Sequence, residues 1–177
     1  MAYKEIVIRV ARMMSRAGLP HAFVGALAAG YHGLARSTRD IDVMVVANRA
    51  EIKELTRLVV AAGFRKIEQP FGTMETGKLV VESDEGYRVE FLLVRTEHEV
   101  ELVKRGMKAH IFGVNVWIAS PEDLVLQKLA IGGAKDIVDA AAVLMRQKGI
   151  LDVRRMESWA SKLGVKNKLK ELMKKVK

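Results

Sequence analysis

The spacing of apolar residues predicts short strands alternating with helices over roughly the first 120 residues. Apolar side chains at helical spacing predict helices over 3–17 and 51–62, and a glycine follows each of them as a helix stop. Small residues over 26–33 predict a tightly packed helix, and 97–104 is also expected to be helical. Runs of β-branched and other apolar residues predict strands, two of them joined by a hairpin turn at 83–86: 21–24, 40–46, 64–68, 78–83, 87–94, 110–112 and 114–119.

The pattern changes at residue 120, where helices replace the strands. Ser120 is a typical helix N-cap and Pro121 suits the first helical position. Helices are predicted from there on, over 121–131, 134–148, 152–163 and 166–175. The chain is therefore expected to be α/β, of the α+β type, with a mixed sheet flanked by helices over residues 1–120. Residues 121–177 are expected to form a helical segment packed on that core.

Composition narrows the function classes. The 177 residues include no cysteine, which excludes disulfides, thiolate nucleophiles and cysteine-based zinc sites. Half of the residues are hydrophobic, which is typical of a folded globular chain. The uncharged runs are too short to span a bilayer and the N-terminus does not resemble a signal peptide, so a cytoplasmic protein with no membrane partner is expected.

The charge is uneven. The net charge is +9, and the stretch from residue 160 onward holds a single acid, Glu171, among seven lysines. Such a tail can attract a polyanion such as RNA, but it is equally expected of a solvated helix face or a frayed end. The lysines concerned are Lys162, Lys166, Lys168, Lys170, Lys174, Lys175 and Lys177.

Two aspartates on one predicted strand are the first candidate chemistry. Asp40 and Asp42 lie on the same face of the strand, with backbones about 6.6 Å apart. At that distance their charges repel by about 2.5 kcal/mol at an effective dielectric near 20. A divalent cation, Mg²⁺ or Mn²⁺, is the natural compensation because hard cations prefer carboxylate oxygens. Alternatively, Arg36 or Arg39 could pair with Asp40, and a neighbouring lysine with Asp42.

A third carboxylate interrupts another apolar strand. Glu90 lies within the run 87–94, where burial is costly unless the charge is paired or bound to a metal. If this strand neighbours the one bearing Asp40 and Asp42, three carboxylates converge and could hold two cations about 4 Å apart. Glu90 could instead face solvent from an edge strand.

The order of these features resembles the polymerase-beta-like nucleotidyltransferase superfamily. Its minimal members have a glycine-led turn before a short helix, followed by an Arg-x-Thr-x-Asp-Ile-Asp string. The chain has Val24-Gly25-Ala26-Leu27-Ala28 and then Arg36-Ser37-Thr38-Arg39-Asp40-Ile41-Asp42, which matches the second string position for position. The stretches 121–129 and 135–139 are similar to the abortive-infection-toxin branch of this superfamily.

The resemblance implies a role for each matching residue of the first motifs. Gly25 and Ala26 would offer backbone amides to the triphosphate of an NTP, and Arg36 would contact phosphate or order the turn that also contains Thr38. Asp40 and Asp42 would bind Mg²⁺ or Mn²⁺ in a two-metal site.

Three further residues receive roles from the same resemblance. Glu90 would be the third carboxylate, as a metal ligand or as the base for the attacking hydroxyl. Lys128 would neutralise the triphosphate, and Asp139 would help to position the acceptor.

The implied activity is transfer of a nucleoside monophosphate from an NTP to an acceptor hydroxyl, with tRNA or protein as acceptor. A toxin-like member would also have an antitoxin partner. Two departures from the family pattern matter: Ala26 replaces the common serine, and Glu90 replaces the commoner aspartate. The rival hypothesis is therefore a catalytically inactive nucleotide- or nucleic-acid-binding protein with the same fold.

Several candidates also have purely structural explanations. Lys128 could belong to the polar stripe of a buried helix, and Asp139 could form a surface pair with Lys135 four residues away. Asp136 is expected to be structural for the same reason. His32 is expected to be a capping residue, and Trp117 and Trp159 are expected to be core residues. His98 and His110 have no partner at metal-ligand spacing and are excluded as zinc ligands.

Overall fold

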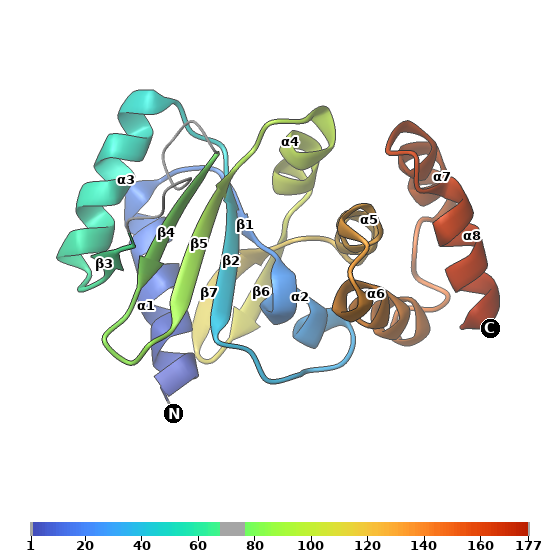
Figure 1. Ribbon diagram of the computed structural model, residues 1–177, viewed down its shortest axis with the longest axis horizontal. Coiled ribbons are helices and arrows are strands. Elements are labelled where there is room, and N and C mark those ends of the chain that lie inside the picture. The colour runs from blue at the N-terminus through green and yellow to red at the C-terminus, as the bar shows by residue number, and fades with distance from the viewer. Residues whose placement is uncertain (1, 68–76, 177) are drawn as a thin grey trace.

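The computed structural model describes residues 2–67 and 77–176 (Figure 1). Helices and strands alternate up to residue 118 and helices follow, as the sequence predicts. The elements, in chain order, are α1 (Ala2–Ala17), β1 (His21–Phe23), α2 (Gly25–His32), β2 (Asp40–Val45), α3 (Arg49–Ala61), β3 (Arg65–Lys66), β4 (Lys78–Glu82), β5 (Arg88–Leu93), α4 (Glu97–Lys104), β6 (Met107–Ile111), β7 (Val114–Ile118), α5 (Pro121–Ile131), α6 (Ala134–Arg146), α7 (Val153–Lys162) and α8 (Lys166–Lys175).

The described strands form one mixed sheet in the order β3-β4-β5-β2-β1-β7-β6. β2 pairs with β5 in parallel and β1 pairs with β7 in parallel, whereas the other neighbours are antiparallel. The expected mixed sheet flanked by helices is confirmed. The expected turn at 83–86 joins β4 to β5 as a hairpin.

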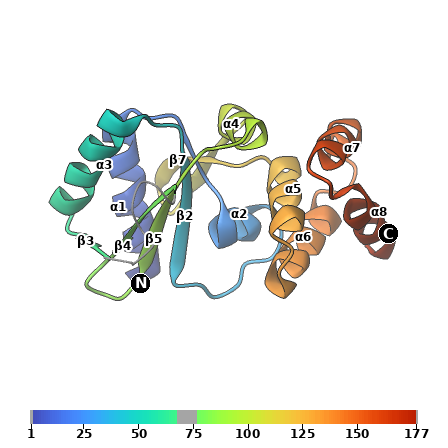
Figure 2. The ribbon, with the colours of Figure 1, turned by 45° about the horizontal axis from the view of Figure 1, so that its top comes forward.

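Helices cover both faces of the sheet. α1 and α3 lie on one face, and α2, α4 and α5 lie on the other (Figure 2). Ile41 and Val43 of β2 are fully buried, as are Phe23 of β1 and Phe91 of β5. Burial of alternate residues of β2 therefore fixes which way its remaining side chains point, because successive side chains of a strand face opposite sides.

The last four helices form a stack on the α2 side of the sheet. α5 packs against α2 and α6, and α7 and α8 lie farther out (Figure 1). α8 buries Leu169 and Leu172, while its lysines are exposed. The basic tail is therefore a packed helix with a solvated cationic face, and not a frayed end, over the described residues.

The β6–β7 hairpin differs from the sequence prediction in three respects. β6 begins at Met107, three residues earlier than expected, because its pairing with β7 extends from Met107 to Ile111. Phe112, expected to end that strand, has a φ of 52° and lies in the turn before Gly113. The prediction of Trp117 as a core residue is wrong: it is 46% exposed, because β7 turns Val116 and Ile118 inward.

Three further expectations concern Trp159, the ends of the described ranges and membrane-spanning helices. Trp159 packs partly buried against the core. Glu68, the expected end of a strand, and Lys177 lie outside the described residues. Within the described ranges, no helix combines the length and the apolar character needed to cross a membrane.

Candidate active site

The three candidate carboxylates lie on two neighbouring parallel strands. β2 carries Asp40 and Asp42, β5 carries Glu90, and the register places Asp42 directly opposite Glu90. Adjacent strands are about 4.8 Å apart, so these two residues share one small area of the sheet. The expected adjacency of the two strands is therefore confirmed.

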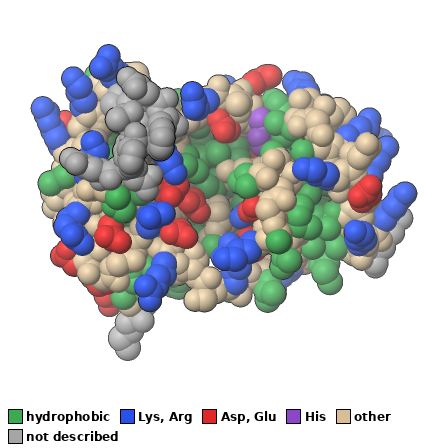
Figure 3. Space-filling view, viewed as in Figure 1, with side chains coloured by type: hydrophobic (Ala, Val, Ile, Leu, Met, Phe, Trp, Pro, Cys, Tyr) green, Lys and Arg blue, Asp and Glu red, His purple; other side chains and the backbone are tan. Residues whose placement is uncertain are grey.

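These acids face the same side of the sheet as the C-terminal helices. Met44, two residues after Asp42, contacts Gln127 of α5 from this side. Acidic side chains appear over β2 and β5 in the space-filling view, beside a hollow that separates the sheet from α5 and α6 (Figure 3). The carboxylates thus border an open space in which a substrate can lie.

Asp42 is in an electrostatically unfavourable position. Burial, together with the charges of Glu90 and Asp40, raises its pKa from 3.8 to about 6. Lys128 and Arg36 oppose this shift only in part. In the described part of the chain, neither Asp40 nor Asp42 forms an ion pair, so the expected alternative of an Asp40 pair with Arg36 or Arg39 is not formed.

Glu90 is held by two basic side chains. Its Oε2 is 3.3 Å from the Nζ of Lys78, and its Oε1 is 3.9 Å from Arg88. β5 lies between β4 and β2, so the alternative of Glu90 on an edge strand is wrong. With the side chains in these positions, no group of three or more His, Asp or Glu residues within 2–67 and 77–176 has the spacing of a metal site.

Gly25 brings the start of α2 against Asp42. The backbone N–H of Val24 donates to the carbonyl oxygen of Asp42 at 2.9 Å. Gly25 has a φ of +59°, and a Cβ at this position would overlap the Oδ2 of Asp42. Only glycine therefore fits here without strain, and its backbone lies next to the carboxylates, as the motif predicts.

Ala26, Arg36 and Thr38, the remaining residues of the predicted nucleotide-binding motif, line one pocket. Its volume is about 370 Å³, within the range of small-molecule sites. The Thr38 hydroxyl accepts from the backbone N–H of Asp40 at 3.1 Å, which orders the start of β2. The structure therefore brings these motif residues together in one pocket, which Thr38 links to Asp40 although none of the three acids lines it.

Aromatic residues complete this pocket, and sequence reasoning missed them. Tyr3 and Phe112 line it from α1 and the β6–β7 turn, with ring centroids 6.5 Å apart. Burial and the nearby charge of Asp42 raise the pKa of Tyr3 to about 12, and its buried hydroxyl has no hydrogen-bond partner among the described residues. The spacing of apolar residues predicts α1 as a helix but does not indicate that Tyr3 lines a pocket.

Arg36 and Lys128 converge on Asp139. Arg36 donates two hydrogen bonds to the Asp139 carboxylate at 3.0 and 3.1 Å, and the Lys128 Nζ lies 3.0 Å from it. Lys128 also contacts Asp136 at 2.8 Å. Among the described residues no ion pair joins Asp139 to Lys135, so the expected surface pair is not formed. Burial by itself would raise the pKa of Asp139, but the hydrogen bonds from Arg36 and Lys128 outweigh it and lower that pKa.

This network ties the turn before β2 to α5 and α6, and Lys128 and Asp139 are 5% and 3% exposed. Lys128 is therefore a buried polar residue of α5, as its structural explanation held, whereas Asp139 is held by buried partners and not by a surface pair. His32 also has a structural contact, because its Nε2 lies 2.7 Å from the carbonyl oxygen of Ala119.

Comparison with known proteins relates this architecture to nucleotidyltransferases. In sequence, the chain matches no family model, and no curated protein is significantly similar to it. In structure, it is similar to ANT(2")-Ia in complex with adenylyl-2"-tobramycin, with a TM-score of 0.64, 15% identity, and coverage of 92% of this chain and 97% of that one.

Two further solved structures are similar. The lincosamide antibiotic adenylyltransferase LnuA has a TM-score of 0.57 at 8% identity, covering 77% of this chain and 93% of its own. An antigenic nucleotidyltransferase-like protein from Paracoccidioides brasiliensis has a TM-score of 0.57 at 16% identity, covering 97% and 91%. The chain thus shares the fold of these proteins over 77–97% of its length.

Proposed function

We propose that the protein is a metal-dependent nucleotidyltransferase. It would transfer a nucleoside monophosphate from an NTP to an acceptor hydroxyl and release pyrophosphate. The observation that carries the proposal is the register of β2 and β5, which sets Asp42 opposite Glu90 with Asp40 on the same strand face, beside the glycine turn at Gly25.

Asp40, Asp42 and Glu90 would hold Mg²⁺ or Mn²⁺. Carboxylates are the oxygen donors that these hard cations prefer. Burial, and then the charges of Glu90 and Asp40, raise the pKa of Asp42, and a bound cation would oppose both effects. Bound cations would supply Lewis-acid activation of the acceptor hydroxyl and stabilisation of the leaving pyrophosphate. Glu90 would first have to leave Lys78, which is 3.3 Å away.

The other motif residues would bind and orient the NTP. The backbone amides at Gly25 and Ala26 face the region where phosphates would lie, at the N-terminus of α2. Arg36 has a 34% exposed side chain, so it can contact a phosphate while it remains bonded to Asp139. Lys128 is almost fully buried and paired with Asp136 and Asp139, so it would have to leave these carboxylates to neutralise the triphosphate.

The acceptor could be small or large. ANT(2")-Ia and LnuA are described with a tobramycin adduct and with lincomycin, and the pocket lined by Ala26, Arg36 and Thr38 has a volume suited to a small molecule. The exposed lysines of α8 instead favour an RNA acceptor, and the abortive-infection resemblance adds protein acceptors and an antitoxin partner. Each of these acceptor classes, small molecules, RNA and proteins, carries a hydroxyl group that the same transfer would modify.

The test is label transfer from each α-labelled NTP, with Mg²⁺ or Mn²⁺, to a panel of tRNA, protein, aminoglycoside and lincosamide. Asp42→Asn should lower transfer by about 100-fold or more, since a cation ligand is lost. The matched control is Asp84→Asn, because Asp84 is an exposed acid of the β4–β5 turn. Transfer that survives Asp42→Asn would refute the proposal.

A second candidate function rests on the Lys78–Glu90 ion pair. If Lys78 permanently occupies the place of a cation, the protein would bind a nucleotide without catalysis, as the loss of the serine hydroxyl at Ala26 also suggests. Calorimetry with ATP separates the two functions. Binding that requires Mg²⁺ and is lost in Asp40→Ala supports the enzyme, whereas metal-independent binding that Lys78→Ala weakens supports the inactive binder.

A further inference from the structure

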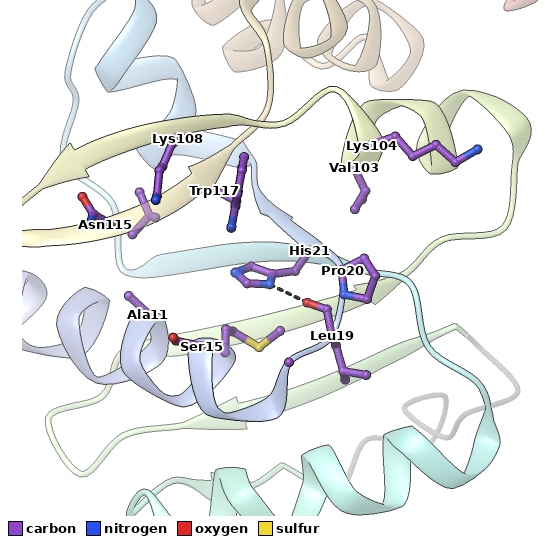
Figure 4. Close-up of a pocket in the computed structure, with 13 residues that line it drawn as sticks. Ala11, Ser15, Leu19, Pro20, His21, Val103, Lys104, Lys108, Asn115 and Trp117 are labelled. Atoms are coloured by element: carbon purple, nitrogen blue, oxygen red, sulfur yellow. Dashed lines mark hydrogen bonds between the residues drawn. The ribbon is translucent and has the colours of Figure 1, made fainter.

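A second, larger cavity lies away from the acids. It has a volume of about 650 Å³ and lies between α1, the start of β1, the end of α4 and the β6–β7 hairpin. None of the proposed site residues lines it. Figure 4 shows the hairpin on one side of this space and α1 on the other. The proposed nucleotidyl transfer does not use this cavity.

The lining of the cavity favours an anion. It contains Lys104 and Lys108 but neither Asp nor Glu. Lys104 is engaged by Glu101 at 3.1 Å and extends away from His21 and Trp117 (Figure 4). Lys108, for which no ion pair exists within the described chain, points into the space between the hairpin and α1 (Figure 4).

His21 supplies a hydrogen-bond acceptor. Its Nδ1 lies 2.8 Å from the carbonyl oxygen of Leu19, which can only accept, so Nδ1 carries the proton. Burial lowers the pKa of His21, so the ring is neutral at pH 7 and its Nε2 is an unprotonated acceptor. The ring lies between Trp117 and α1 in Figure 4, and its Nε2 has no hydrogen-bond partner among the described residues.

Trp117 adds an exposed flat ring. It is 46% exposed and is paired across the hairpin with Lys108. Its indole nitrogen, which can only donate, points toward His21 (Figure 4). An exposed aromatic face next to an ammonium group is the combination that binds a base together with its phosphate.

We propose that this cavity binds a nucleotide, with the phosphate at Lys108, the base against Trp117 and an exocyclic amino group of the base donating to His21 Nε2. The nucleotide is either a free mononucleotide or one unit of an RNA strand, since both present the same chemistry. Its volume lies within the range of about 300–1,000 Å³ that is typical of ligand sites. This site is independent of the acids on β2 and β5.

Tryptophan fluorescence of the full chain tests the proposal. The chain has two tryptophans, so Trp159→Phe leaves Trp117 as the reporter. The probes are AMP and a single-stranded adenylate hexamer, each with EDTA to exclude metal-dependent binding at the acids. Both should change the Trp117 emission saturably, and binding of the hexamer alone would assign the site to an RNA strand.

Matched variants, each in the Trp159→Phe background, locate the ligand. Lys108→Ala should weaken binding by about tenfold or more, the effect of losing one charged hydrogen bond. Lys104→Ala should change it by less than about twofold, because Lys104 points away. Asp42→Asn should bind as tightly as its parent, whether or not the protein transfers nucleotides.

Three results would overturn the proposal. They are an unchanged Trp117 emission at millimolar AMP and hexamer, an unchanged affinity in Lys108→Ala, and a loss of binding in Asp42→Asn. Lys108 is exposed, so its substitution does not remove a core contact, and circular dichroism of each variant confirms that it folds.

Discussion

Asp42 is the residue on which the electrostatics of the proposed site depend. It lies opposite Glu90, shares a strand with Asp40 and touches the backbone of Gly25. The protein keeps this carboxylate where its charge is unfavourable, which lowers the stability of the folded state. A bound cation would remove that cost, so metal binding and stability should be linked.

The pH dependence of stability should reveal this cost. The pKa of Asp42 is about 6 in the folded protein and 3.8 for an ordinary carboxyl. Between about pH 4 and pH 6, Asp42 therefore binds a proton in the folded state but not in the unfolded state. Stability therefore falls as pH rises through that window. Without metal, Asp42→Asn should be more stable than wild type above pH 6 by on the order of 1–3 kcal/mol, and equally stable near pH 4.

Urea unfolding of both proteins at several pH values, in EDTA, measures the difference. A constant difference across the range would show that Asp42 ionises normally. Adding Mg²⁺ at pH 7.5 should stabilise wild type more than Asp42→Asn, because only wild type retains all three carboxylates.

Gly25→Ala should be costly for two separable reasons. The left-handed φ of +59° is strained for alanine, and the new Cβ would overlap Asp42. Gly18→Ala is the matched control, because Gly18 has a φ of +65° with nothing within 4 Å of the added Cβ. The control should lose about 1 kcal/mol and Gly25→Ala at least about 2 kcal/mol more in urea unfolding. Equal losses would mean that Asp42 moves aside freely.

At the scale of elements, the junction between the core and the C-terminal helices is ionic as well as apolar. Arg36 precedes β2, Lys128 is on α5, and both contact Asp139 of α6. A buried ion network of this kind depends on every member, because removing one leaves its partner uncompensated. The position of α5 and α6 relative to the acids is thus tied to these contacts.

Lys128→Met should destabilise the fold by about 3–5 kcal/mol, because Asp139 stays buried with Arg36 as its remaining cation. Lys135→Met, on the exposed side of α6, is the control and should stay within about 0.5 kcal/mol of wild type. Thermal unfolding of the two variants gives the comparison. A cost as small as that of the control would show that Asp139 is compensated without Lys128.

Most helices and strands could be predicted from residues within or next to each element. Ser120 and Pro121 define the start of α5, and the bounds predicted for α4, α5 and α8 coincide with the structure. The start of β6 was missed because its first residues, 107–109, become a strand through pairing with β7 and not through their own pattern. Trp117 was predicted to be buried because its neighbours Val116 and Ile118 are apolar as well. The sequence around it therefore does not show the alternation of buried and exposed residues that β7 has.

At the scale of the whole molecule, the sequence predicted the three carboxylates of the proposed site but not the side chains that surround them. The motif strings and strand periodicity predicted Asp40, Asp42 and Glu90 on adjoining strands. The Lys78–Glu90 pair, the Arg36–Asp139 pair and the buried Tyr3 hydroxyl were not predictable, because each depends on contacts between segments far apart in the chain. The packing of α8 likewise depended on which side of a lysine-rich helix meets α5 and α6.

The cationic face of α8 can be tested without removing the helix. Deleting it would expose the contacts of Leu169 and Leu172, so charge neutralisation is the sharper experiment. Changing Lys166, Lys170, Lys174 and Lys175 to Gln should weaken tRNA binding and reduce the dependence of log Kd on log salt by up to about 0.9 per lost phosphate contact. A control with Lys4, Lys53, Lys66 and Lys148 changed to Gln carries the same net charge elsewhere, and equal slopes in both variants would exclude α8 as an RNA contact.

The parallel pairing of β2 with β5 has a consequence for biosynthesis. A ribosome must complete α3, β3 and β4 before the strand that carries Glu90 can dock beside Asp42, because parallel neighbours need a long crossover. A nascent chain that stops short of residue 88 therefore contains Asp40 and Asp42 but lacks Glu90, and the pairing of β2 with β5 cannot form. The proposed transfer would therefore require that more than half of the polypeptide has been translated, and shorter products would lack it.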